Sequence, residues 1–238
     1  MHRRTALRAL AAGLLPVGLL QACGGGGGGL EGAADAGARA LASLQPLALW
    51  GDSHVGGLPG NPEVPGVASK LSEIAGGRQV MDGGVAGQTS TQIADRMVQD
   101  SAHDAWVTVF WYGGNNQNQP EAIKADLARS VASLAPGNER FVVLPVLNQA
   151  APWERRGTPT YQTIIELNQE LAALYPDNFL DIRSHLVGLY NRNSPADVAD
   201  FQDDVVPTSL RADGVHLNHE GALAVARRLL EFIVSRGW

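Results

Sequence analysis

Residues 106–147, WVTVFWYGGNNQNQPEAIKADLARSVASLAPGNERFVVLPVL, decide the fold class. The apolar runs that open and close this stretch are short and rich in β-branched and aromatic residues, which is typical of buried strands. Between them lies Pro120, which suits a first helical turn, and then apolar residues recur on one helical face. These residues are Ile123, Leu127, Val131 and Leu134. A strand, a helix and a second strand in this order predict a parallel crossover unit.

The alternation continues on both sides of this stretch. Strands are expected at 46–50, 79–81, 106–112, 141–147 and 179–182. Helical patterns cover 164–174, which Pro176 ends, and 222–233, for which Asn218 is a suitable N-cap. Three stretches lack a regular pattern and are expected to form pocket walls or surface loops: 54–64, 148–158 and 191–212. The elements predict an α/β fold, a three-layer αβα domain around a five-stranded parallel sheet.

The first 22 residues have the layout of an export signal. Arg3, Arg4 and Arg8 form a basic start, and the apolar stretch 9–20 is too short to span a bilayer as a helix. The paired arginines fit a twin-arginine signal as well as a general secretory one. We therefore expect residues 1–22 to be an export signal peptide.

Cys23 is the one cysteine of the chain, so no internal disulfide can form. Together with Leu20, Gln21 and Ala22 it resembles the lipobox of bacterial lipoproteins, although Gln21 is not the usual small residue. The glycine-rich sequence that follows predicts a flexible tether over 23–44. We expect lipidation at Cys23 to anchor a domain at 45–238 to the bacterial cell envelope, facing the periplasm or the outside. An incidental cysteine after an ordinary cleaved signal is the alternative.

The charge balance bears on possible partners. The chain has 18 Lys and Arg against 24 Asp and Glu, for a net charge of −6, and it contains no basic run that could neutralise a row of phosphates. Nucleic acid is therefore not expected as a partner. Apart from the membrane, we expect a monomer that acts on a small-molecule or carbohydrate substrate without a cofactor.

Three predicted strands end in residues that can carry chemistry. Ser53 follows the first strand, Gly87 lies beyond the second, and Asn115 follows the third. A serine hydroxyl is a poor nucleophile until a base removes its proton. His216 can be that base, and Asp213, on the same short turn, can orient the imidazole ring and stabilise its charged form.

An ester carbonyl that is attacked by serine develops a negative oxygen, which needs hydrogen-bond donors. The backbone N–H groups of Ser53 and Gly87 and the side-chain amide of Asn115 are suitable donors, because glycine leaves its N–H open and an amide does not titrate. The sequence thus predicts an oxyanion hole of Ser53, Gly87 and Asn115 beside a triad of Ser53, Asp213 and His216.

These four blocks resemble the SGNH (GDSL-like) hydrolases over roughly residues 46–236. Gly51-Asp52-Ser53 is similar to the first block of that family, Gly87 and Asn115 to the second and third, and Asp213 with His216 to the last. His54 replaces the leucine of the GDSL signature, and Asn116 replaces the aspartate that usually follows the asparagine. The resemblance implies a flavodoxin-like strand order. The Gly-x-Ser-x-Gly elbow of the α/β-hydrolases is absent.

The resemblance also implies a serine esterase that works through an acyl-serine. Short acyl esters such as acetyl esters, carried on a carbohydrate, are the expected substrates because no long apolar lid is evident. Two alternatives remain open: a lysophospholipase or arylesterase of broad acyl specificity, and a polysaccharide O-acyltransferase with the same triad. A binding protein with a dead site is disfavoured, because every expected catalytic side chain is present.

Several other side chains need an interpretation. Asp52 is interpreted as a loop-shaping or capping residue, and His54 and His103 as surface or pocket-edge residues. Trp153 and Tyr161 follow a strand end in a proline-bearing loop and are candidates for the substrate-binding site. His219 could join Asp213 and His216 in a metal site, but no further ligand stands at the expected spacing, so no metal is expected.

Overall fold

The computed structural model describes residues 44–238, so the export signal, Cys23 and almost all of the tether lie outside the described residues. The strands are β1 (Leu47–Gly51), β2 (Val80–Gly84), β3 (Val107–Trp111) and β4 (Phe141–Val143). The helices are α2 (Ser53–Gly56), α3 (Val67–Ile74), α4 (Ser90–Met97), α5 (Pro120–Ala132), α6 (Pro159–Leu174), α7 (Ile182–Gly188), α8 (Pro195–Gln202) and α9 (His219–Ser235). Two short 3₁₀ turns are η1 (Pro152–Glu154) and η2 (Thr208–Leu210).

The sheet is parallel throughout and has the order β2-β1-β3-β4. β1 therefore lies between β2 and β3, and its last residue, Gly51, pairs with Gly84 on one side and Trp111 on the other. The segments that follow these three strands consequently start from one edge of the sheet. Ser53, Gly87 and Asn115, which follow β1, β2 and β3, are therefore all expected at this edge of the sheet.

The expected fifth strand is not formed, so the sheet has four strands within residues 44–238. Phe179 makes only an isolated bridge to Val143, because Asp181 caps the segment as a helix by accepting a hydrogen bond from Ser184 N–H and α7 begins at once. β4 is also shorter than expected, since it ends at Val143 instead of continuing to 147.

A side chain takes the place of a strand beyond the end of β4. The amide of buried Asn168 accepts a hydrogen bond from Val146 N–H at 2.8 Å and donates one to Val146 C=O at 2.9 Å. These are the two bonds that a neighbouring strand would make. Asn168 on α6 thus satisfies the N–H and C=O groups of buried Val146, beyond the end of β4.

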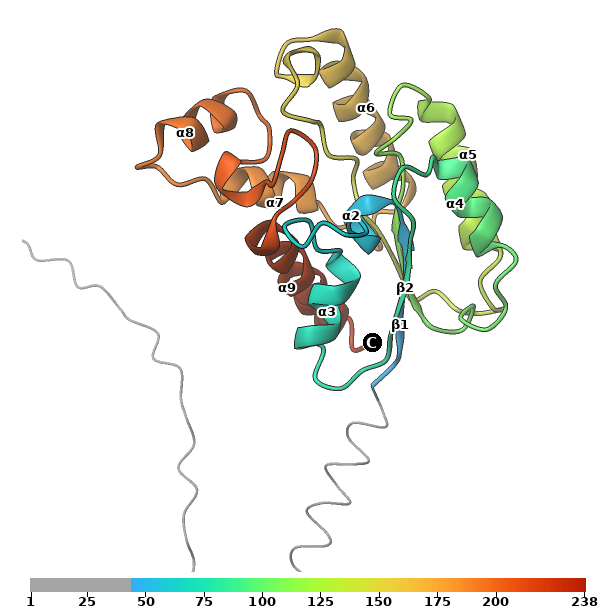
Figure 1. Cartoon of the computed structure of the whole chain (residues 1–238). Helices are drawn as coiled ribbons and strands as arrows, with labels where there is room; N and C mark the ends of the chain where they lie inside the picture. The colour runs from blue at the N-terminus through green and yellow to red at the C-terminus, as the bar shows by residue number, and fades with distance from the viewer. Residues whose placement is uncertain (1–43) are drawn as a thin grey trace, which may run out of the picture. The chain divides into compact units, whose positions relative to one another are not determined.

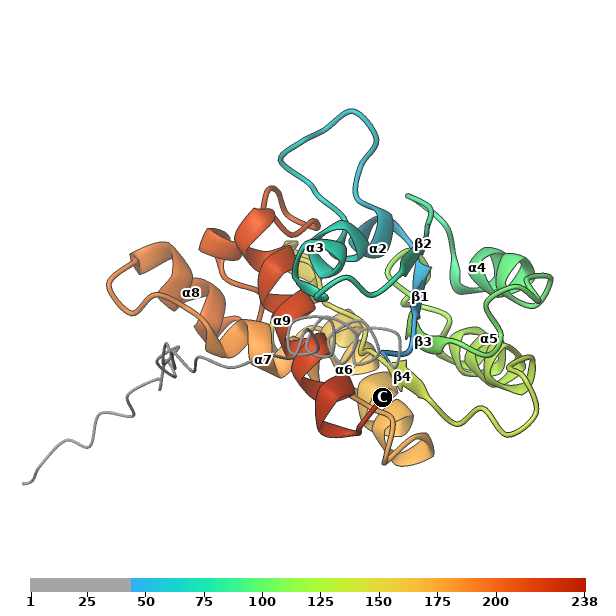
Figure 2. The same cartoon turned by 90° about the horizontal axis from the view of Figure 1, so that it is seen from below.

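Alternate residues of the strands point to opposite faces, and each face has its own core. Leu47 and Leu49 pack with the apolar faces of α3, α7 and α9, whereas Ala48 and Trp50 pack with those of α4, α5 and α6. Figures 1 and 2 show α3 and α9 on one side of the sheet and α4 and α5 on the other. The predicted three-layer α/β arrangement is confirmed.

The strongly periodic helices were predictable, but several short ones were not. α5, α6 and α9 lie where periodicity places them, and Asn218 caps α9 by accepting a hydrogen bond from Gly221 N–H at 3.0 Å. The stretch 191–212, expected to be irregular, contains α8 and η2. No helix within the described residues is long and apolar enough to cross a membrane.

Candidate active site

Ser53 is the first residue of α2, at the point where the chain turns out of β1. Asp52 caps this short helix by accepting a hydrogen bond from His54 N–H at 2.9 Å, which confirms the interpretation of Asp52 as a capping residue. The turn requires glycine at position 51, because a Cβ there would clash with its neighbours. It would lie 2.4 Å from Val55 Cγ2 and 2.8 Å from Trp111 O. The Ser53 residue is 6% exposed, so its position is set by close packing.

The predicted nucleophile, base and acid meet in one chain of hydrogen bonds. His216 Nε2 lies 3.1 Å from Ser53 Oγ, and His216 Nδ1 lies 2.8 Å from Asp213 Oδ2. The carboxylate can only accept, so Nδ1 carries a hydrogen and, in the neutral ring, Nε2 presents a lone pair to the hydroxyl. This is the tautomer that a base for Ser53 requires.

Asp213 is held as a carboxylate. Partial burial alone would raise its pKa, but hydrogen bonds from the backbone and ring of His216 and from Val215 N–H outweigh burial and keep the pKa below its usual range. Its negative charge therefore persists into mildly acidic solution, where it can stabilise a protonated His216 ring.

Hydrogen bonds from Asn115 join the three segments that carry the predicted oxyanion donors. Asn115 Nδ2 donates to Asp52 Oδ2 at 3.2 Å and to the carbonyl of Gln88 at 3.0 Å, which are residues adjacent in sequence to Ser53 and Gly87. Gly87 has a φ of +79°, a conformation that glycine adopts without strain. Within the described part of the chain, no hydrogen-bond acceptor lies against the N–H of Ser53 or of Gly87. Both groups are therefore open to a substrate oxygen.

Asn116, which departs from the family pattern, has a structural partner. Its Oδ1 accepts from Ser90 N–H at 3.0 Å and its Nδ2 donates to Ser90 Oγ at 2.9 Å, so it fixes the first turn of α4. Ser90 Oγ in turn donates to Asp126 on α5. Asn116 thus links the loop of Asn115 to two helices on one face of the sheet.

His54 lies deeper than expected. Its side chain is 9% exposed, and its ring centroid is 5.0 Å from that of Trp111 and 6.1 Å from that of His216. Its Nδ1 is 3.3 Å from Asp52 Oδ1, and its Nε2 is buried without a partner among the described residues. Sequence reasoning missed this packing because Trp111 and His216 are distant from His54 in sequence.

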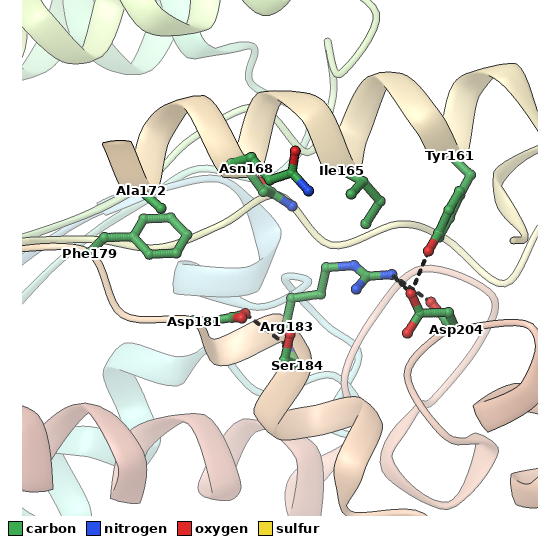
Figure 3. A pocket seen from close by; sticks show the side chains of 10 residues that line it. Tyr161, Ile165, Asn168, Ala172, Phe179, Asp181, Arg183, Ser184 and Asp204 are labelled. Carbon is green, nitrogen blue, oxygen red and sulfur yellow. Dashed lines mark hydrogen bonds and ion pairs between the residues drawn. The ribbon is translucent and has the colours of Figure 1, made fainter. Parts of the chain in front are cut away.

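The two aromatic candidates lie in different surroundings. Trp153 on η1 is 62% exposed, whereas the hydroxyl of Tyr161 donates a hydrogen bond to Asp204 at 2.7 Å. Tyr161 lines a cavity of about 260 Å³ between α6 and α7, in which Arg183 also reaches Asp204 (Figure 3). Burial and the hydrogen bond to Asp204 raise the pKa of Tyr161.

The ring of His219 contacts the loop that precedes α3. Its Nε2 lies 2.9 Å from the carbonyl of Pro62. Across residues 44–238, no group of three or more His, Cys, Asp or Glu side chains is arranged to hold a metal ion.

Comparison with known proteins identifies the fold. No protein-family model matches the chain. A G-D-S-L family lipolytic protein from Desulfitobacterium hafniense has a TM-score of 0.60 at 15% identity, with 79% of this chain and 99% of that chain covered. An acylhydrolase from Bacteroides fragilis has a TM-score of 0.59 at 19% identity, covering 84% and 94%. An acetyl xylan esterase has a TM-score of 0.59 at 15% identity, covering 78% and 98%.

One curated protein also shows similarity in sequence. The tail spike protein of Salmonella phage epsilon15 is 28% identical over 151 residues, which cover 58% of this chain. The matched part spans 14% of the tail spike protein.

Proposed function

We propose that this chain, which has the SGNH/GDSL-like hydrolase fold, is a serine esterase. The single observation that supports the proposal best is the geometry at Ser53, where a hydroxyl, an imidazole and a carboxylate form a continuous line at 3.1 Å and 2.8 Å. The esterases and acylhydrolases among the structural neighbours support the same class of reaction.

In the proposed reaction Ser53 Oγ attacks the ester carbonyl while His216 Nε2 takes its proton. The carbonyl oxygen becomes negative and accepts hydrogen bonds from the N–H groups of Ser53 and Gly87. Asn115 Nδ2 donates a third once one of its two hydrogens turns away from Asp52 or from the carbonyl of Gln88. His216 then gives the proton to the departing alcohol, which leaves an acyl-serine. A water molecule, deprotonated by His216, attacks this ester. The bond from the acyl carbon to Ser53 Oγ breaks, His216 returns the proton to Oγ, and the acid is released.

Short acyl groups on a carbohydrate are the substrates that we propose. Trp153 supports this choice, because its indole is exposed while its turn is held rigidly: Glu154, 1% exposed, accepts hydrogen bonds from Gln149 N–H and from Gln117. The same loop reaches the turn of Asp213 and His216, since Ala150 N–H donates to the carbonyl of Gly214 at 2.8 Å. An exposed, fixed indole is suited to stack on a sugar ring.

The reaction is tested with nitrophenyl acetate and the variant Ser53→Ala, with Ser101→Ala as the matched control because Ser101 is an exposed serine outside the site. We expect Ser53→Ala to abolish turnover and Ser101→Ala to retain it. Full activity of Ser53→Ala would refute the proposed mechanism. A series of nitrophenyl esters then tests the acyl group: a maximum at acetyl supports the proposal, and a maximum at long chains indicates a lipid esterase instead.

The carbohydrate is tested with Trp153→Ala, assayed on acetylated xylo-oligosaccharides and on nitrophenyl acetate. We expect KM for the oligosaccharide to rise by roughly tenfold, the equivalent of about 1.4 kcal/mol, with little change for the small ester. Leu174→Ala, which removes another exposed apolar side chain at the far end of α6, is the control. Equal KM values in Trp153→Ala and the parent would exclude the stacking role. Product analysis in the same assay distinguishes hydrolysis from transfer to the sugar.

We also propose that the chain is exported and anchored by a lipid on Cys23, as its lipobox-like sequence predicts. Metabolic labelling with a fatty acid tests this placement. Label is expected in the parent chain and not in Cys23→Ser, which is expected in the soluble fraction. Unlabelled parent chain would contradict the anchor without affecting the proposed reaction.

A further inference from the structure

The turn that carries Asp213 and His216 has little apolar burial to fix it. The Asp213 side chain is 47% exposed, and Ala212 and Gly214 beside it are also exposed. Inside the turn, Ala212 N–H donates to His216 C=O at 2.9 Å. Polar contacts at the base of the turn, where Arg211 bridges to buried Leu217, therefore help to set where the base stands relative to Ser53.

Arg211 provides such contacts from a side chain that is 11% exposed. Its Nη1 donates to the carbonyl oxygen of Asp213 at 3.0 Å, and its Nε donates to Val206 C=O at 2.6 Å. Its Nη2 donates to Asp200 at 2.8 Å and to Thr208 Oγ1 at 3.0 Å. One planar guanidinium thus joins the turn to three other points of the chain, which fixes its direction as well as its distance.

The partner of Arg211 is itself held firmly. Asp200 of α8 is 7% exposed and accepts hydrogen bonds from Thr208 N–H at 2.7 Å and Thr208 Oγ1 at 2.6 Å. Asp197, one helical turn earlier and 1% exposed, accepts from Ser209 N–H at 3.1 Å and Ser209 Oγ at 2.5 Å. The two carboxylates therefore fasten η2, the segment that leads directly into Arg211.

Buried charge is costly unless every member is paired, so this arrangement needs a reason. We propose that Arg211, oriented by Asp200, is a positioning residue that holds His216 and Asp213 in register with Ser53. The inference rests on the proposed esterase reaction. A shift of about 1 Å in a reacting group can lower a rate by on the order of a hundredfold, which is the effect that the Arg211 contacts prevent.

The first test compares Arg211→Ala, Arg211→Lys and Asp200→Asn with the parent chain on nitrophenyl acetate. We expect Arg211→Ala to lower kcat by roughly ten- to a hundredfold with a much smaller change in KM. Arg211→Lys is expected to be intermediate, because an ammonium keeps the charge next to Asp200 but cannot reach all of the acceptors. Asp200→Asn, which is nearly isosteric, is expected to lower kcat in the same direction.

Arg228→Ala is the matched control, because Arg228 forms an exposed ion pair with Glu231 on α9. It should leave kcat unchanged. Added guanidinium, at a concentration below that which unfolds the parent chain, should restore part of the kcat that Arg211→Ala loses. The same addition should leave the kcat of Arg228→Ala unchanged. A kcat of all three Arg211 and Asp200 variants within twofold of the parent would overturn the proposal.

A double-variant cycle separates positioning from a general loss of fold. In a His216→Ala background the base is absent, so adding Arg211→Ala should lower the residual hydrolysis no further. A loss as large as in the parent background would show that Arg211 acts on the whole fold and would overturn the inference. Such a loss would contradict the role of Arg211 and leave the proposed esterase function untouched. Full activity of Ser53→Ala would instead refute the esterase function.

Discussion

The Nε2 atom of His216 lies 3.1 Å from the Oγ atom of Ser53, although 163 positions separate the two residues in the chain. The contact joins the start of α2 to the turn that precedes α9. A proton can pass directly across this distance.

The base and the acid should differ in their importance. We expect His216→Ala to lower kcat by on the order of 10⁴- to 10⁶-fold, because among residues 44–238 His216 Nε2 is the hydrogen-bond partner of the Ser53 hydroxyl. Asp213→Asn should cost roughly one to two orders of magnitude less, since the ring remains and only its orientation and charge stabilisation are lost. Steady-state kinetics on nitrophenyl acetate measures both. Equal losses would show that the carboxylate has a more direct role.

The lowered pKa of Asp213 has a consequence for the stability of the fold. Because the folded-state pKa of Asp213 is lowered, its stabilising contribution is present above the unfolded-state pKa and is lost as the pH falls through the folded value. Thermal unfolding of the parent chain and Asp213→Asn should therefore converge in strongly acidic solution and differ near neutral pH. Differences of the same size at every pH would rule out this linkage.

Removal of the Asn115 amide should act mainly on kcat. Asn115→Ala is expected to lower kcat by roughly 10²- to 10³-fold, the loss typical of one oxyanion donor. Asn118→Ala, an exposed asparagine on the same loop, is the control and should match the parent. A rise in KM alone would instead assign Asn115 to substrate binding.

Asn168 should matter for stability and not directly for chemistry. Asn168→Leu preserves the approximate side-chain shape but leaves the buried N–H and C=O of Val146 without their partners, so unfolding free energy should fall by about 2 to 4 kcal/mol. Chemical denaturation measures this change. Gln169→Leu, at the exposed neighbouring position, should have little effect. A similar cost for both variants would mean that Asn168 does not replace a strand.

Much of the framework follows from local sequence pattern. The periodicities of α5, α6 and α9, the apolar run of β3 and the Asn218 cap depend on residues a few positions apart, so the chain itself encodes them locally. The residues proposed for the site could also be named, because Ser53, Asn115 and the Asp213–His216 pair each stand directly after a strand or before a helix.

Other features depend on tertiary structure because they join distant segments. The two hydrogen bonds between Asn168 and Val146 join α6 to the segment beyond β4, and the burial of His54 depends on its packing against Trp111 and His216. Periodicity does not report such contacts, since they are determined by which side chains meet after folding.

The sequence by itself therefore determined the α/β alternation and the residue types needed for acyl transfer. Only the folded chain decided that Ser53 and His216 stand in contact, and that Arg211 links Asp213 to Asp200. The physical reason is that a hydrogen bond requires its atoms within about 3 Å, a precision that only the packed sheet and helices provide.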